Sequence, residues 1–120
     1  MSLLGLHHVQ LAIPYGAEDR ARAFYGDLLG LTVVPKPQEL AGRGGLWFET
    51  GTLRLHLGIE TPFNPARKAH PAFTVQDLIA LRTRLAAAEV EVTEISALPG
   101  LTRFYASDPF RNRLEFIQPG

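Results

Sequence analysis

Histidine and carboxylate side chains gather on the polar faces of the strands that the sequence predicts. Successive side chains of a strand point to opposite faces, so residues of one parity share a face. In these strands one parity is apolar and the other carries polar residues, among them His8, Arg54, His56, His70, Arg113 and Glu115. Solvation alone explains this composition poorly, because lysine, threonine and serine are the less costly surface choices and imidazole is a good ligand for divalent metals.

The polar faces therefore predict a divalent metal site. Two imidazoles and one carboxylate with open coordination positions suit Fe, Mn, Ni, Co or Zn. The chain contains no cysteine, so any metal must be held by histidine and carboxylate, and disulfides and thiolate nucleophiles are excluded. The candidate ligands are spread over most of the chain and match no local motif, so the spacing alone leaves a chance arrangement of strand histidines open.

The elements that must position these residues follow from hydrophobic periodicity and turn residues. The predicted strands cover residues 6–13, 31–34, 45–50 and 53–59, and then 70–75, 90–95, 102–107 and 113–117. A first helix starts at the acidic pair Glu18 and Asp19 and ends at Gly30, and Asp77 caps a second helix. Each half reads β-α-β-β-β, and Glu60–Lys68 connects them.

The two halves resemble each other in residues as well as in order. The segment Arg54–Leu57 resembles Arg113–Phe116, and His8 precedes His70 by a similar interval of roughly sixty residues. We therefore expect an α+β fold of two βαβββ modules within a single domain, residues 1–120. Module one is expected at residues 1–61 and module two at residues 67–120.

Composition excludes several partners. The 12 Lys+Arg and 12 Asp+Glu residues give zero formal net charge, so no global charge recruits nucleic acid or an anionic membrane. No apolar run reaches the ~20 residues needed to cross a bilayer, and no signal-peptide pattern opens the chain. We expect a cytoplasmic protein that binds neither nucleic acid nor membrane.

Four segments in order resemble the vicinal oxygen chelate superfamily, which includes glyoxalase I, fosfomycin-modifying thiol transferases, extradiol dioxygenases and bleomycin-binding proteins. These segments are GLHHVQLAIP, ARAFYGDLLGL, AHPAFTVQDL and SDPFRNRLEFIQP. The resemblance spans nearly the whole chain. It implies a glyoxalase-like fold in which mixed sheets curve around a central cavity.

The resemblance also implies a ligand set, and the parity argument reaches the same residues. The implied metal ligands are His8, His70 and Glu115, with Glu115 as the catalytic residue as well. The neighbouring His7 shares parity with apolar residues and is expected to turn toward the helix side. His56 lies where glyoxalase-type members place a further carboxylate, so its role is left open between a fourth ligand, an outer-shell group and a substrate contact.

Arg54 and Arg113 flank the ligand positions on the same faces. They are candidates, with His56, for binding an anionic substrate, for balancing Glu115, or for ordinary solvated charges. Four aromatic residues could line an apolar pocket or belong to the core, and the sequence leaves both alternatives open: Trp47, Phe48, Phe104 and Tyr105.

The resemblance implies a metal-dependent lyase, isomerase or dioxygenase that acts on a small oxygenated molecule chelating the metal through adjacent oxygens. The alternative is a non-catalytic small-molecule binding or drug-sequestration protein of the bleomycin-binding type. A homodimer is expected, with modules paired either within one chain or between chains.

One departure from the family pattern concerns the turn before the last strand. Arg111 stands where the closing motif usually has glycine, and Asp108 reads as a turn initiator rather than a catalytic acid. Because arginine tolerates a positive φ poorly, we expect Asn112 to adopt it or the loop to differ.

Overall fold

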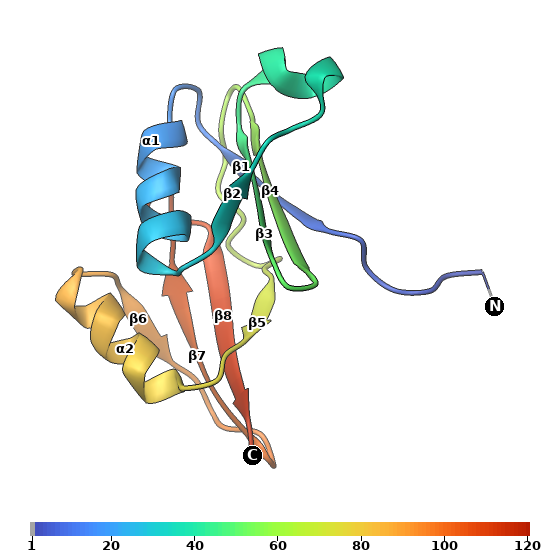
Figure 1. Ribbon diagram of the computed structural model, residues 1–120. Coiled ribbons are helices and arrows are strands. Elements are labelled where there is room, and N and C mark those ends of the chain that lie inside the picture. Colours follow the sequence, from blue (N-terminus) through green and yellow to red (C-terminus); the bar gives the residue numbers. More distant parts are fainter. Residues whose placement is uncertain (1) are drawn as a thin grey trace. The chain divides into compact units, whose positions relative to one another are not determined.

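The computed structural model describes residues 2–120, which fall into two compact units, one ending at Asn64 and the other beginning at Pro65 (Figure 1). This division lies between the predicted module boundaries at residues 61 and 67. No helix within residues 2–120 combines the length and the apolar character that spanning a membrane requires.

The first unit is a four-stranded mixed sheet with two helical segments. Its strand order is β1-β4-β3-β2, with β1 parallel to β4 and the other neighbours antiparallel. The strands are β1 (Val9–Ile13), β2 (Thr32–Val34), β3 (Leu46–Thr50) and β4 (Leu53–Ile59), and the helices are α1 (Glu18–Ala21), its π-helical continuation η1 (Arg22–Leu28) and the 3-10 helix η2 (Gln38–Arg43).

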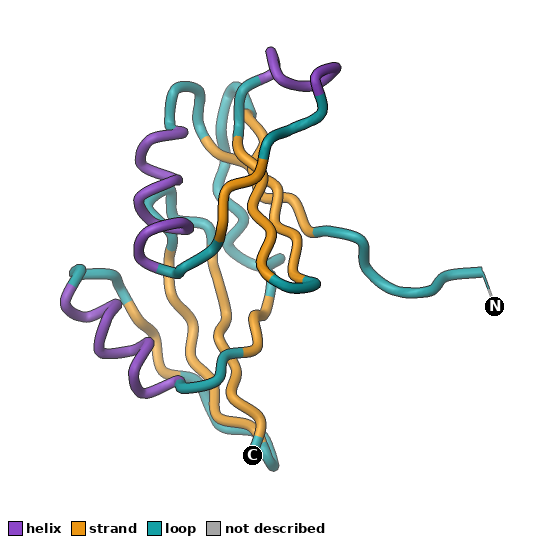
Figure 2. Tube along the Cα trace, viewed as in Figure 1, coloured by secondary structure: helices purple, strands orange, loops and turns teal. Residues whose placement is uncertain are grey.

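The second unit repeats this topology. Its strand order is β5-β8-β7-β6, again with the first pair parallel and the others antiparallel. Figure 2 shows its helix in purple beside its strands in orange. The elements are β5 (Ala72–Thr74), α2 (Leu78–Ala87), β6 (Val92–Glu94), β7 (Leu101–Ser107) and β8 (Arg113–Pro119). The predicted α+β fold of two βαβββ modules is confirmed, whereas the central cavity stays a prediction.

In each unit the helix covers the apolar face of its sheet. The ring of Tyr25 lies against Phe48 in the first unit, and the guanidinium of Arg82 lies over the ring of Phe104 in the second. Phe48 and Phe104 are fully buried, so they belong to the core. The other face of each sheet therefore carries the polar residues, as strand alternation predicted.

The two strands expected to carry metal-binding histidines begin later than predicted. β1 begins at Val9 rather than residue 6, and β5 begins at Ala72 rather than residue 70. His8 and His70 thus immediately precede their strands. Strand alternation does not fix these two side chains, so their contacts must come from the rest of the sheet face.

The turn between β7 and β8 resolves the question posed by Arg111. Arg111 itself adopts φ 76°, so the first of the two expected alternatives, a positive φ at Asn112, is wrong. Asn112 is instead buried, where its side chain donates to Asp108 and accepts from the Ala66 N–H. The side chain of Asn112 thus stabilises the turn by hydrogen bonds, and Arg111 adopts the left-handed backbone conformation.

We expect Arg111→Gly to stabilise the protein by about 0.5–1 kcal/mol, because relief of the left-handed strain exceeds the added entropy of glycine in the unfolded chain. The backbone carbonyl that accepts a bond from Arg67 is retained. Thermal and urea unfolding measure the change. The same substitution in α2, Arg84→Gly, should destabilise by about 1 kcal/mol, and a loss of stability in both variants would contradict the prediction.

Candidate functional site

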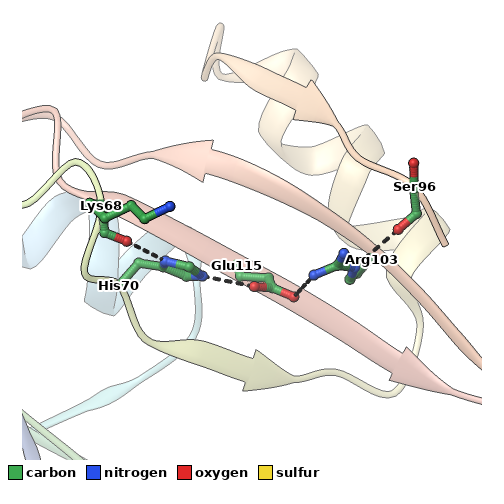
Figure 3. Close-up of polar contacts among 5 residues, drawn as sticks. All are labelled: Lys68, His70, Ser96, Arg103 and Glu115. Carbon is green, nitrogen blue, oxygen red and sulfur yellow. Dashed lines mark hydrogen bonds and ion pairs between the residues drawn. The ribbon is translucent and has the colours of Figure 1, made fainter. Parts of the chain in front are cut away.

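His70 and Glu115 form a direct contact on the polar face of the second sheet (Figure 3). The imidazole Nε2 of His70 lies 2.8 Å from Oε1 of Glu115, and both side chains are largely buried. The contact spans the parallel pair β5 and β8, where Ala72 is in register with Glu115. Parallel pairing of strands distant in the sequence therefore brings together the predicted imidazole and carboxylate.

The other nitrogen of His70, Nδ1, also has a partner. Its Nδ1 lies 2.9 Å from the carbonyl oxygen of Lys68, which can only accept, so Nδ1 carries a hydrogen. A neutral ring would then point the lone pair of Nε2 at a carboxylate oxygen. The 2.8 Å separation is that of a hydrogen bond when Nε2 carries a hydrogen, and that of two neighbouring ligands when a metal cation lies between them.

Arg103 forms a hydrogen bond with the second carboxylate oxygen of Glu115. Its Nη1 donates to Oε2 over 3.1 Å, and its Nε donates to the carbonyl of Ser96 over 3.1 Å (Figure 3). Burial raises the pKa of Glu115, but the hydrogen bonds from His70 and Arg103 outweigh it, so the pKa lies below its ordinary value. Arg103 was not among the site residues predicted from the sequence, although its parity with Tyr105 on β7 places it on the polar face.

Tyr105 and Arg113 complete this face of the second sheet. Tyr105 is in register with Glu115 across β7 and β8, and its ring meets the His70 ring edge-on, with centroids 5.2 Å apart. The guanidinium carbon of Arg113 lies 4.6 Å from the centre of the Tyr105 ring. The arginine is thereby held by a cation–π contact beside the His70–Glu115 pair.

In the first unit, the equivalent face carries a stack of three rings. His56 is sandwiched between Trp47, at a centroid distance of 3.9 Å, and His8, at 4.1 Å. His56 is in register with Trp47, as Glu115 is with Tyr105, so the two sheets place them equivalently. His7 is exposed and its ring meets that of His8, so it does not turn toward the helix side as expected.

The imidazole of His56 is held in its neutral form. Burial lowers its pKa, and the neighbouring His8 and His7, when charged, lower it further, with an opposing contribution from Glu49. A neutral imidazole retains one unprotonated nitrogen. His56 can therefore accept a hydrogen bond or bind a metal at neutral pH.

Arg54 has a carboxylate partner of its own. Its Nε lies 3.5 Å from Oε1 of Glu49, and both side chains are about two-fifths exposed, at 40% and 41%. A surface ion pair of this kind is common and weak. Arg54 and Arg113, which the sequence treats as equivalent, therefore have different surroundings.

The structure thus brings the predicted site residues together in two groups, His70 with Glu115 and Arg113, and His8 with His56. Within either unit taken by itself, the residues described hold no group of three histidine or acidic side chains placed to bind one metal ion. His70 and Glu115 are two of the three ligands that the sequence predicts.

A protein family matches nearly the whole chain. The family described as the Glyoxalase/Bleomycin resistance protein/Dioxygenase superfamily has a model that matches residues 5–116. No curated protein matches the chain.

Solved structures match over nearly the full length. A Bacillus anthracis protein described as belonging to the glyoxalase family is 46% identical, with a TM-score of 0.95, and the match covers 100% of this chain and 98% of that one. A glyoxalase/dioxygenase from Nostoc punctiforme is 20% identical, with a TM-score of 0.81 and coverage of 99% and 93%. The fosfomycin resistance protein FosX from Listeria monocytogenes is 17% identical, with a TM-score of 0.78 and coverage of 98% and 95%. The last two likenesses are likenesses of fold.

Proposed function

Because the chain belongs to the glyoxalase/bleomycin resistance protein/dioxygenase superfamily, we propose that it is a metal-dependent enzyme of the lyase, isomerase or dioxygenase kind. Its substrate is a small oxygenated molecule that chelates the metal through two adjacent oxygens. The observation that carries the proposal is the 2.8 Å contact between Nε2 of His70 and Oε1 of Glu115, with the opposite ring nitrogen fixed by a carbonyl.

The donor set of this pair fits a divalent metal. Two ligands at right angles around an ion with bonds of 2.0–2.2 Å lie about 3 Å apart, close to the observed spacing. His70 and Glu115 would hold the metal, which is Fe, Mn, Ni, Co or Zn, and His8 stays a ligand predicted from the sequence. When bound, the metal supplies Lewis-acid chemistry that polarises the two substrate oxygens.

The remaining polar residues receive roles in binding. Arg113 is held against Tyr105 and has no carboxylate partner among the ion pairs of the described residues, so it binds an anionic oxygen of the substrate. His56, neutral and stacked on His8, is a second candidate for substrate contact. Arg54 contributes less to substrate binding than Arg113, because Glu49 already balances the charge of Arg54.

Assembly and location stay predictions from the sequence. The N-terminal leucines Leu3, Leu4 and Leu6 are 85%, 97% and 87% exposed, and this apolar surface supports burial against a second copy of the chain. A homodimer in the cytoplasm is the expected form, with no nucleic-acid or membrane partner.

Metal titration of histidine variants tests the proposal. Purified without chelator and loaded with Mn, Fe, Co, Ni or Zn, the protein should bind about one equivalent per chain. His70→Gln should lower the affinity by far more than His56→Gln, for which we expect a loss of about tenfold or less, the lower end of outer-shell effects. Calorimetry and elemental analysis measure both.

Equal losses of metal affinity in His70→Gln and His56→Gln would show that His56 is itself a metal ligand. If the unsubstituted protein bound no metal, the proposal of a metal-dependent enzyme would be wrong, and the alternative of a non-catalytic binding protein would be favoured. A ligand screen in the presence of chelator would then detect metal-independent binding of a small molecule.

A further inference from the structure

We propose that Arg103 is a positioning residue that holds Glu115 so that the carboxylate meets the metal through Oε1 alone. This inference rests on the proposed metal site at His70 and Glu115. It assigns a role to an arginine that neither the polar pattern of the sequence nor the family match singles out.

The two oxygens of Glu115 face different partners. Oε1 lies 2.8 Å from Nε2 of His70, and Oε2 lies 3.1 Å from Nη1 of Arg103 (Figure 3). Glu115 is 5% exposed, so solvent does not compete strongly for either oxygen. The carboxylate is therefore divided between an oxygen that faces a candidate metal ligand and an oxygen that faces a permanent cation.

Arg103 is itself held in place. Its Nε donates to the carbonyl of Ser96 while its Nη1 donates to Glu115, so two acceptors on opposite sides fix the plane of the guanidinium. The side chain is 20% exposed. Arg103 lies on β7 opposite Ile117, one diagonal step from Glu115, a distance that a long side chain spans.

This arrangement restricts how Glu115 can coordinate. An oxygen that accepts a charge-assisted hydrogen bond from arginine has less electron density to donate, and the guanidinium occupies the space on that side. Oε1 keeps its orientation toward His70, at the separation that neighbouring ligands of one ion require. Arg103 thus contributes to metal binding through the position of Glu115 rather than through contact with the metal.

The sign of the effect distinguishes positioning from simple charge. Removing a cation near a metal site relieves repulsion and by itself tightens metal binding. Loss of a hydrogen-bond partner of a ligating carboxylate has the opposite effect and typically costs 10–100-fold in affinity. A weaker site after loss of Arg103 is therefore opposite in sign to the effect of removing the repulsion between its charge and the metal.

The test is a titration with Co²⁺, whose visible absorption reports the number and arrangement of its ligands. The variants are Arg103→Met, which removes charge and hydrogen bonds, and Arg103→Lys, which keeps the charge and loses the planar fork. Arg113→Met is the matched control, because it removes a cation from the same sheet face. The guanidinium of Arg113 contacts the ring of Tyr105 and not the carboxylate of Glu115.

We expect Arg103→Met to bind Co²⁺ about 10–100-fold more weakly and with an altered absorption spectrum, and Arg103→Lys to lie between it and the unsubstituted protein. Arg113→Met should keep the original spectrum and bind at least as tightly. If Arg103→Met fails to fold, an altered spectrum in Arg103→Lys supports the inference, and an unchanged affinity and spectrum in that variant overturns it.

Unchanged Co²⁺ affinity and spectrum in folded Arg103→Met would overturn the inference and leave the proposed function intact. An equal weakening in Arg113→Met would also overturn it, because the effect would then be general to the sheet face. Failure of the unsubstituted protein to bind Co²⁺ would overturn the proposed function and this inference together.

Discussion

Glu115→Gln is expected to lower the affinity for Co²⁺ or Zn²⁺ by more than about 100-fold, a larger loss than outer-shell substitutions produce. The substitution keeps the size of the side chain and replaces one carboxylate oxygen by an amide nitrogen that donates and cannot bind a metal. It also removes the negative charge that Arg103 and His70 surround. Calorimetric titration measures the affinity.

Glu49→Gln is the matched control for this experiment. It removes the same charge from a carboxylate that pairs with Arg54 on the exposed part of the first sheet. We expect its metal affinity to match that of the unsubstituted protein. Metal binding by a folded Glu115→Gln protein at the original affinity would show that this carboxylate is not a ligand.

Asp108→Ala is expected to destabilise the protein by about 3 kcal/mol, because each buried donor that loses its acceptor costs about 1–3 kcal/mol. Asp108 is 4% exposed, and its carboxylate accepts from the N–H of Phe110, the N–H of Asn112 and the side-chain amide of Asn112, at 2.8, 2.8 and 2.9 Å. These bonds shape the turn that leads into β8. The loss would be a large fraction of a typical folding free energy.

Asp77→Ala provides a comparison with a single capping bond. Asp77 caps α2 by accepting from the N–H of Ala80 over 3.0 Å in an exposed setting, so its loss should cost only about 1 kcal/mol. Urea unfolding of both variants measures the difference. If Asp108→Ala lost no more stability than Asp77→Ala, the buried turn network would not contribute as argued.

The sequence determined the modules and the faces of their sheets. Alternating polarity is a local property of a strand, and it correctly separated Leu55 and Leu114 of the core from His56 and Glu115 on the other face. The cap at Asp77 was likewise readable, because a capping bond joins residues three positions apart. The family followed from four segments in order, and the match over residues 5–116 confirms it.

The turn before β8 was only partly predictable. The Asp-Pro dipeptide indicated a turn, but which residue takes the positive φ depends on where Asn112 finds its partners. Asn112 bonds to Asp108 and to the distant N–H of Ala66, so its backbone conformation is set by contacts across the second unit. Arg111 therefore takes φ 76° against its intrinsic preference.

Only the tertiary structure decided how the site residues meet. The parallel register of β5 with β8 brings His70 to Glu115 across 45 residues of sequence, and His8 stacks on His56 from outside its strand. Arg103 reaches Glu115 diagonally between neighbouring strands. Alternation states which face a side chain occupies, but register, side-chain length and competing acceptors determine its partner, and these depend on pairing between segments far apart in the chain.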